Sequence, residues 1–415
     1  MAARDRTTAR QRVTFERVTS TTSETALVAT LLPNQQIAAA AVAAWDAGEA
    51  IAPIALSATR HEIADRLARL RPTHLVDASG RRRLADGLPV AADTAAVVTT
   101  SGTTGAPKLV ELTRSGMDVM GHGYREAVGA NRDDCWLACM PLAHVASLAI
   151  VARAYVGGLP FAVHDAFDPE RVASSHKHDR ATMISLVPTA LARLIDNGAP
   201  LARFRCLIIG GAVLTTQLRA RAEATGARVV DAYGLTETWG GCAIDGRANA
   251  GIELRLGDND EVEVRGAPVM RGYRFDAEAT AAAFTPDGWL RTGDVGQFDP
   301  RDGRLAIVDR RKDLVISGGV NVSPTEVEAV LGAHPGVRDV CVIGADDPEW
   351  GERVVAVVVP ADPGRPPSLG ELRDFGRERL SAAKLPREVR IIADIPRSAS
   401  GKALRRLLTT AETSD

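Results

Sequence analysis

Short apolar runs alternate with helix-like patterns from residue 26 onward, and this alternation limits the fold more than any other feature of the chain. The runs ALVATLL, IAPIAL and THLVDAS each predict a short strand, because they are apolar and bounded by turn residues. Between them, QQIAAAAVAAWDAG predicts a helix that ends at Gly48, and ATRHEIADRLARLRP predicts an amphipathic helix that ends before Pro72. Since strands connected by crossover helices pair in parallel, we expect an α/β fold with mostly parallel sheets.

The pattern changes twice further along the chain. Over Gly251–Phe275, short alternating segments such as IELRLG and EVEVRG predict a small antiparallel β unit. Later, Ser323 as N-cap and Glu326 three residues on predict a helix start, followed by the strand-like runs DVCVIGA and RVVAVVVP. We therefore expect two domains: residues 1–309 as a large N-terminal domain and residues 310–415 as a small α+β C-terminal domain.

The composition of the chain argues against some classes of binding partner. The 415 residues carry a formal net charge of −2 and only 4% aromatic side chains, which argues against a surface for nucleic acid or anionic membrane. The five cysteines are scattered and lack the paired spacing of a zinc site, as expected for reduced thiols. No run of 18 apolar residues is present, and no apolar stretch follows the charged N-terminus. We expect a cytoplasmic protein with small-molecule partners.

The segment TTSGTTGAPK, directly after the predicted strand Ala95–Val98, has the composition of a phosphate-binding loop. It contains Thr99, Thr100, Ser101, Gly102, Thr103, Thr104 and Lys108. Hydroxyl groups and close-approaching glycine amides surround phosphate oxygens with donors, and a lysine adds a compact positive charge. The spacing is not that of a Walker A motif. The alternative, a polar surface turn, is disfavoured by ten residues of this composition that end in lysine.

Four further segments are individually weak signals. Tyr233–Glu237 (YGLTE) follows a predicted strand and offers an aromatic face, a hydroxyl and a carboxylate, which suit a base, a phosphate oxygen and Mg²⁺. Asp294, in GWLRTGD, suits ribose hydroxyls, although an isolated aspartate there is more simply a turn residue. Arg310 lies in the cluster DRRKD, which is either a solvated linker or a hinge. Lys402 follows a Ser/Gly segment, where a basic C-terminus is the ordinary interpretation.

Together, the order and spacing of these motifs resemble those of the AMP-forming superfamily that includes acyl-CoA synthetases, adenylation domains and luciferases, from about Ala26 to Leu408. The resemblance implies a large N-terminal domain and a C-terminal lid, joined by a hinge near Lys312. It also implies an enzyme that makes an acyl-adenylate from an acid and ATP, releases pyrophosphate, and then passes the acyl group to CoA. The implied cofactors are ATP and Mg²⁺, with CoA as the second substrate.

The resemblance assigns roles to individual residues of this sequence. Thr99–Lys108 would hold the β- and γ-phosphates, Thr236 would contact the α-phosphate, and Glu237 would hold Mg²⁺. Lys402 would bridge the substrate carboxylate and the α-phosphate, where an anion attacks an anion and charge neutralisation lowers the barrier. His144 would gate the acyl pocket. The remaining implied contacts, to adenine and ribose, are Gly211, Ala212, Asp231, Tyr233, Gly234, Asp294 and Arg310.

Some positions depart from the superfamily pattern, namely Leu109, Arg114 and Asp309, but none of them removes a catalytic group. The phosphate loop also begins near residue 99, earlier than in most members. We interpret this as a shortened front of the N-terminal domain, which favours a homodimer. A non-catalytic nucleotide-binding protein is disfavoured, because the implied catalytic and nucleotide-binding groups are all present.

Three segments, WLACMPLAHVASLAIVARAYVGGLP, SLVPTALARL and YGLTETWGGCAIDGR, most resemble the short o-succinylbenzoate–CoA ligases of actinobacterial menaquinone synthesis. The implied pocket wall is His144, Ser147, Leu148, Gly211, Trp239, Gly240 and Gly241. Small residues there leave room for an aryl acid, and Trp239 is equally well explained as a core residue. The alternatives are another aryl- or acyl-CoA ligase, an enzyme that loads a carrier protein, and one that activates a different oxyanion such as nitrite.

Overall fold

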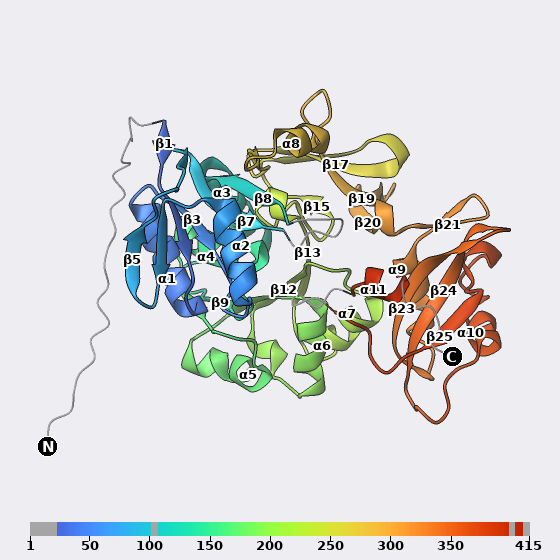
Figure 1. Ribbon diagram of the computed structural model, residues 1–415. Helices are drawn as coiled ribbons and strands as arrows, with labels where there is room; N and C mark the ends of the chain where they lie inside the picture. Colours follow the sequence, from blue (N-terminus) through green and yellow to red (C-terminus); the bar gives the residue numbers. More distant parts are fainter. Residues whose placement is uncertain (1–22, 101–106, 398–402, 410–415) are drawn as a thin grey trace, which may run out of the picture.

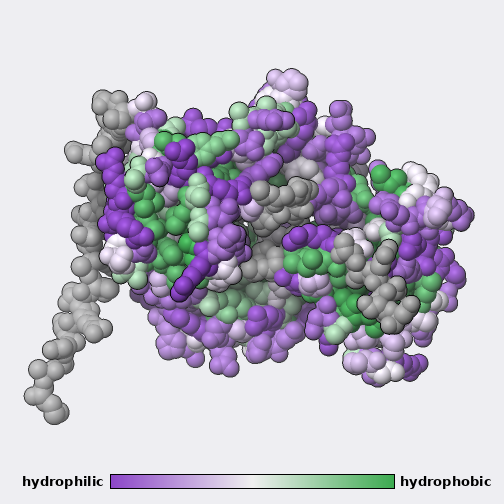
Figure 2. All heavy atoms as spheres, viewed as in Figure 1, coloured by the Kyte–Doolittle hydropathy of each residue, from purple (hydrophilic) through white to green (hydrophobic). Residues whose placement is uncertain are grey.

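The computed structural model describes residues 23–100, 107–397 and 403–409. Of the predicted site residues, those outside the described ranges are Ser101, Gly102, Thr103, Thr104 and Lys402. Figure 1 shows an N-terminal α/β body (blue to green), a β-rich unit (yellow to orange) and a smaller C-terminal domain (orange to red). Hydrophilic side chains cover most of the face seen in Figure 2. No helix in the described ranges is long and apolar enough to cross a membrane.

The first large sheet contains the strands predicted from the alternating pattern. Its parallel strands are β2 (Leu27–Thr30), β3 (Ala50–Pro53), β4 (His74–Asp77) and β7 (Thr94–Thr99). Antiparallel strands complete the order β18-β8-β7-β3-β2-β4-β5, namely β5 (Gly80–Arg83), β8 (Leu109–Thr113) and β18 (Gly272–Tyr273). The crossover helices are α1 (Asn34–Asp46) and α2 (Arg60–Leu70). A separate short pair is formed by β1 (Glu24–Thr25) and β6 (Val90–Ala91).

The second large sheet has the order β10-β9-β11-β12-β13-β14-β15. Its parallel strands are β9 (Trp136–Ala138), β10 (Phe161–Val163), β11 (Met183–Leu186), β12 (Cys206–Gly210) and β13 (Val229–Tyr233). A short antiparallel edge is added by β14 (Ala243–Ile244) and β15 (Arg247–Ala248). Its helices are α3 (Arg114–Val128), α4 (Val145–Gly157), α5 (Pro169–His178), α6 (Pro188–Asp196) and α7 (Thr216–Glu223), with 3₁₀ turns η1 (Leu201–Arg203) and η2 (Thr236–Thr238).

One apolar core joins the two large sheets. It contains Ile51 from β3 and Ile208 from β12, together with Met120 from α3 and Val151 from α4. Since α3 and α4 contribute to a core that includes strands of both sheets, the two sheets are held in one body. The prediction of mostly parallel sheets with crossover helices is confirmed for this body.

The small antiparallel unit exists, but its extent differs from the prediction. It consists of β16 (Ile252–Leu256), β17 (Glu261–Gly266), β19 (Leu290–Phe298) and β20 (Leu305–Arg310), with η3 (Asp258–Asp260) and the neighbouring α8 (Ala277–Ala283). The unit therefore continues well past Phe275. The predicted range also loses Gly272–Tyr273 to the first large sheet, because Tyr273 pairs with Val110 of β8.

The C-terminal domain is built on one sheet with the order β22-β21-β24-β23, and β25 pairs with β24. Its elements are η4 (Arg311–Asp313), β21 (Val315–Ser317), β22 (Val320–Val322), α9 (Pro324–Leu331), β23 (Val337–Asp347), β24 (Gly351–Pro360), α10 (Leu369–Gly376), η5 (Ala382–Lys384), β25 (Glu388–Ile391) and α11 (Arg406–Thr409). The predicted start of α9 is confirmed, since Ser323 Oγ accepts a hydrogen bond from the Glu326 amide. Asp309, at the end of β20, also accepts from Ser323 Oγ at 2.7 Å and thereby ties the two domains together.

Candidate active site

The main cavity of about 1090 Å³ opens where the carboxyl ends of strands from both large sheets meet. Thr99 ends β7, Leu186 ends β11, Gly210 ends β12, and Gly234 follows β13, and all four residues line the cavity. In parallel α/β sheets, ligands bind in the crevice outside the carboxyl ends of the strands, where the loops that follow the strands form the walls. The predicted site residues that line the cavity are Thr99, Thr100, Lys108, His144, Ser147, Gly211, Gly234, Thr236, Glu237, Gly240 and Arg310.

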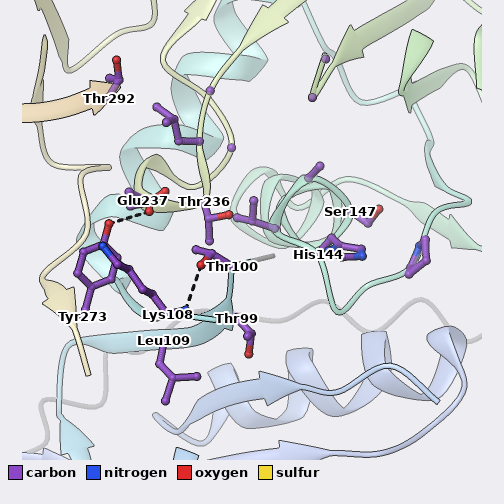
Figure 3. A pocket seen from close by; sticks show the side chains of 18 of the residues that line it. Thr99, Thr100, Lys108, Leu109, His144, Ser147, Thr236, Glu237, Tyr273 and Thr292 are labelled. Atoms are coloured by element: carbon purple, nitrogen blue, oxygen red, sulfur yellow. Dashed lines mark hydrogen bonds between the residues drawn. The ribbon is translucent and has the colours of Figure 1, made fainter. Parts of the chain in front are cut away.

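Thr100 and Lys108 belong to the predicted phosphate loop, lie on either side of its undescribed segment, and are hydrogen-bonded to each other. The Thr100 amide donates to the Lys108 carbonyl oxygen at 2.9 Å, and the Lys108 amide donates to Thr100 Oγ1 at 3.2 Å. The Lys108 ammonium lies over the ring of Tyr273, with Nζ 4.3 Å from the ring centroid. Figure 3 shows these side chains gathered at one end of the cavity, with Thr236 and Glu237 nearby.

Glu237, the residue predicted from the sequence to hold Mg²⁺, lines the cavity. It lies on η2, next to Thr236, and its Oε1 accepts a hydrogen bond from the Tyr273 hydroxyl at 2.9 Å. Within the described ranges, no cluster of three histidine, cysteine, aspartate or glutamate side chains forms a metal cage. Mg²⁺ in nucleotide sites is usually bound by one or two carboxylates, substrate phosphates and water, so this sparse donor set fits the ion.

Arg310 lines the cavity and forms an ion pair with Asp294. Arg310 Nε lies 2.6 Å from Asp294 Oδ1, while the Tyr233 hydroxyl donates to Asp294 Oδ2 at 2.7 Å. Burial, and then the Asp294 charge, raise the pKa of Tyr233 well above its usual value, so this hydroxyl keeps its proton and remains a donor. The three residues therefore form a connected group across β13, β19 and β20, with Arg310 as the member on the cavity wall.

His144 and Ser147 line the other end of the cavity, near the start of α4 (Figure 3). His144 is the residue before α4, and its ring makes no capping hydrogen bond. Burial lowers the pKa of His144, and the charge of Arg66 acts in the same direction. The imidazole is therefore neutral at pH 7 and can form part of an apolar pocket wall.

Three residues that we expected in the pocket wall do not line the cavity. Trp239 is completely buried, and its Nε1 donates to the Thr113 carbonyl oxygen at 3.0 Å. Its left-handed backbone (φ 54°), directly after η2, turns the indole toward the apolar core that joins the two large sheets. Leu148 packs in the same core. Gly241 lies behind the wall, where a Cβ atom would come within 2.2 Å of the Tyr124 ring.

Two family models match the chain, one described as "AMP-binding enzyme" at residues 83–274 and one as "AMP-binding enzyme C-terminal domain" at residues 326–402. The 2-succinylbenzoate–CoA ligase of Bacillus licheniformis is 36% identical over 346 residues, which cover 76% of this chain and 70% of that protein. The chain belongs to the AMP-binding enzyme family. The enzyme of the same name from Listeria innocua is 32% identical over 329 residues, covering 76% of this chain and 69% of that protein.

Solved structures of AMP-binding enzymes have the same fold. The o-succinylbenzoate CoA synthetase (MenE) from Bacillus subtilis, in complex with the acyl-adenylate intermediate OSB-AMP, has a TM-score of 0.82 at 29% identity. The match covers 94% of this chain and 89% of that one. ATP-bound MatB from Rhodopseudomonas palustris has a TM-score of 0.83 at 26% identity, with 93% and 88% coverage.

Other predicted residues of this AMP-binding enzyme lie outside the cavity wall. Ala212 is exposed beside Gly211, and Lys312 is exposed on η4. Asp231 is half-buried on β13, and burial raises the pKa of its carboxyl group. Lys402 lies outside the described residues, but its flanking residues Arg397 and Ala403 pair as an antiparallel bridge. Arg397 lines a second cavity, of about 780 Å³, which shares wall residues with the main one.

Four further cavity residues were not predicted from the sequence, because the fold brings them together from distant segments. They are Tyr124 on α3, Arg153 on α4, Ser185 on β11 and Tyr273 on β18, and all four line the cavity. One signal was present in the sequence. Arg153 interrupts the apolar run of α4, VASLAIVARAYVG, and arginine is rarely buried unless it is paired.

Proposed function

We propose that this AMP-binding enzyme is an ATP-dependent acid–CoA ligase whose acid carries a second carboxylate, with o-succinylbenzoate as the leading candidate. The acid and ATP give the acyl-adenylate and pyrophosphate, and CoA then takes the acyl group as a thioester. The names of the curated relatives and the OSB-AMP complex of the B. subtilis enzyme support this acid. An observation within this chain supports it independently.

That observation is Arg153, a buried cation on the cavity wall. The residue is only 5% exposed, and no ion pair joins it to a carboxylate of the described chain. Its guanidinium is stacked on the rings of Tyr124 and Trp136, at 4.1 and 4.8 Å from the ring centroids. Nη2 lies 3.5 Å from Ser185 Oγ, whereas Nη1 is buried with no hydrogen-bond partner in the described part of the chain.

A buried guanidinium without a counter-charge is costly, and arginine cannot escape by losing its proton. A substrate carboxylate placed at Nη1 would supply both the missing charge and the missing acceptor. Since the carboxylate to be adenylated has to reach the α-phosphate near Thr236, a carboxylate at Arg153 must be a second one. This requirement selects a dicarboxylic acid over a simple aryl acid.

In the adenylation step, one oxygen of the first carboxylate forms a bond to the α-phosphorus. The bond from that phosphorus to the bridging oxygen breaks, and the electron pair leaves with pyrophosphate. We propose that Thr236 orients the α-phosphate, that Lys402 neutralises charge between the two anions, and that Mg²⁺ held with Glu237 supplies further neutralisation. The proposed nucleotide contacts are Thr99, Thr100, Ser101, Gly102, Thr103, Thr104, Lys108, Gly211, Ala212, Asp231, Tyr233, Gly234, Asp294 and Arg310.

We further propose a domain boundary between residues 309 and 310 and a hinge near Lys312. The passage of the chain from the four-stranded sheet to the C-terminal sheet across Arg311–Asp313 supports this placement. A homodimer and a cytoplasmic location complete the proposal, and analytical ultracentrifugation tests the former.

The test is pyrophosphate release from the purified protein against a panel of acids, with and without CoA. The panel pairs each diacid with the matching monoacid, so that o-succinylbenzoate is compared with 4-phenyl-4-oxobutanoate, which lacks the ring carboxylate. We expect CoA-dependent turnover with the diacid and at least tenfold lower kcat/KM with the monoacid, the loss typical of an unpaired buried charge. Turnover of another acid in place of o-succinylbenzoate would remove this assignment.

A further inference from the structure

Tyr273 contacts two charged side chains of the cavity wall, and Figure 3 shows its hydroxyl directed at Glu237 and the Lys108 side chain beside its ring. Its hydroxyl donates to Glu237 Oε1 at 2.9 Å, and its ring face carries the Lys108 ammonium at 4.3 Å. No ion pair joins Lys108 directly to Glu237 in the described structure. Tyr273 therefore binds the Glu237 carboxylate through its hydroxyl and the Lys108 ammonium through the face of its ring.

The backbone places all three residues in this arrangement. Tyr273 on β18 pairs with Val110 on β8, and Lys108 comes two residues before Val110. Lys108 lies directly before β8, and the hydrogen bond from the Thr100 amide to the Lys108 carbonyl oxygen at 2.9 Å continues the β7–β8 pairing to it. Because side chains alternate along extended backbone, Lys108 is on the same face as Val110 and is a diagonal neighbour within reach of the Tyr273 ring. On the other side, the Met270 amide donates to the Glu237 carbonyl oxygen at 2.7 Å.

The segment that carries Tyr273 is itself firmly held. The Tyr273 amide donates to Thr280 Oγ1 at 2.8 Å. The next residue, Arg274, is buried, lies 3.1 Å from Glu111 Oε1, and donates from Nε to the Leu70 carbonyl oxygen at 3.0 Å. These contacts hold the backbone of Tyr273 in a fixed position.

A lysine and a glutamate that face the same space attract each other and form an ion pair unless other groups engage them. Such a pair would neutralise the two charges that a nucleotide and its metal ion need. The tyrosine ring attracts the ammonium electrostatically, and the tyrosine hydroxyl orients one carboxylate oxygen while leaving the other available.

We propose that Tyr273 is a positioning residue that keeps Lys108 and Glu237 apart and presents both to one triphosphate–Mg²⁺ unit. The proposal rests on the proposed function, because it takes Glu237 as the metal ligand and Lys108 as a phosphate ligand. Its consequence is that the two parts of the side chain have separable roles: the hydroxyl serves the metal ion and the ring serves the phosphates.

Two variants separate these roles. Tyr273→Phe removes the hydroxyl and keeps the ring, whereas Tyr273→Leu removes both. Calorimetry of the full-length protein measures ATP binding in metal-free buffer. A separate titration without chelator measures Mg²⁺ binding to the protein–ATP complex, with Mg²⁺ titrated into ATP alone as the reference. Tyr155→Phe is the matched control, because its hydroxyl donates to Asp46 Oδ1 at 2.9 Å in a region outside the cavity wall.

For Tyr273→Phe we expect about tenfold weaker Mg²⁺ binding, the lower end of the effect of losing a partner that orients a metal ligand. Its affinity for metal-free ATP should stay within about twofold of wild type, since the ring contact of Lys108 remains. Tyr273→Leu should weaken metal-free ATP binding as well, and Tyr155→Phe should change neither quantity.

Mg²⁺ binding by Tyr273→Phe within about twofold of wild type, with the same melting temperature, would overturn the positioning role. The same holds if Tyr155→Phe loses as much Mg²⁺ affinity as Tyr273→Phe, because the effect would then be a general loss of stability. Failure of the proposed function looks different: the wild-type protein itself would not bind ATP and Mg²⁺ together, or would bind them and turn over none of the acids.

Discussion

Arg310 Nε lies 2.6 Å from Asp294 Oδ1, so an arginine on the cavity wall is held by a carboxylate buried behind it. The second oxygen of Asp294 accepts the Tyr233 hydroxyl at 2.7 Å. The guanidinium of Arg310 is therefore oriented by contacts within the protein itself. Because the side chain is already ordered, binding of a ligand to it loses less conformational entropy.

Asp294→Asn should weaken ATP binding without unfolding the enzyme. The substitution keeps the shape but removes the charge that holds Arg310, and hydrogen bonds to charged groups contribute about 1.5–3 kcal/mol. We expect the KM for ATP to rise about tenfold or more, measured by pyrophosphate release at saturating acid. Asp299→Asn serves as the control, because Asp299 pairs with the exposed Arg301 at 2.7 Å. Equal effects of both variants would argue against the Arg310–Asp294 role.

Lys402→Ala should separate the two half-reactions. We expect adenylation to fall by a factor of about 30 to 1,000, which corresponds to the 2–4 kcal/mol typical of a preorganised electrostatic group. Thioester formation from a supplied acyl-adenylate should stay largely intact, because that step needs a different set of groups. The two rates are measured separately, by pyrophosphate exchange and by consumption of CoA thiol. Equal loss in both would be inconsistent with a lid that uses Lys402 for one step only.

Arg153→Met should change substrate selection without lowering the stability of the protein. Nη1 of Arg153 is buried without a partner in the described residues, and well-packed apolar replacements of buried charges are often neutral or stabilising. We expect an unchanged or higher melting temperature, together with a loss of the preference for the diacid over its monoacid. The discriminating measurement is the ratio of the two kcat/KM values, since a merely damaged enzyme would lose both in proportion.

His144 should make stability depend on pH in a defined direction. Burial lowers the pKa of His144, with Arg66 acting in the same direction, so the unfolded chain binds a proton at a higher pH than the folded protein does. Stability should therefore fall as the pH drops below about 6.5, the usual histidine value, toward the lower folded pKa. His144→Gln should flatten the melting-temperature profile between about pH 5 and 7, whereas the exposed His178→Gln should not. A wild-type slope in His144→Gln would assign the pH dependence to other groups.

The sequence by itself determined those features that depend on neighbouring residues. Periodicity and capping chemistry operate within a few residues. They were sufficient to predict the strands β2, β3 and β4, the helices between them, and the start of α9 at Ser323. The order of the motifs was also sufficient to place Thr100, Lys108, Thr236 and Glu237 in one cavity. Thr100 follows the end of β7, and Thr236 and Glu237 follow the end of β13, at the edge where parallel sheets bind ligands.

Only the tertiary structure decided which side chains face the cavity. Trp239 bonds to Thr113, 126 residues earlier, and its left-handed backbone points it away from the ligand space. Tyr273 leaves the small β unit for a strand of the first sheet, and Arg153 finds its position only where α4 crosses behind β11. These outcomes depend on pairings between segments far apart in the sequence, and no local pattern specifies them, because the free energy that selects them comes from packing in the assembled core.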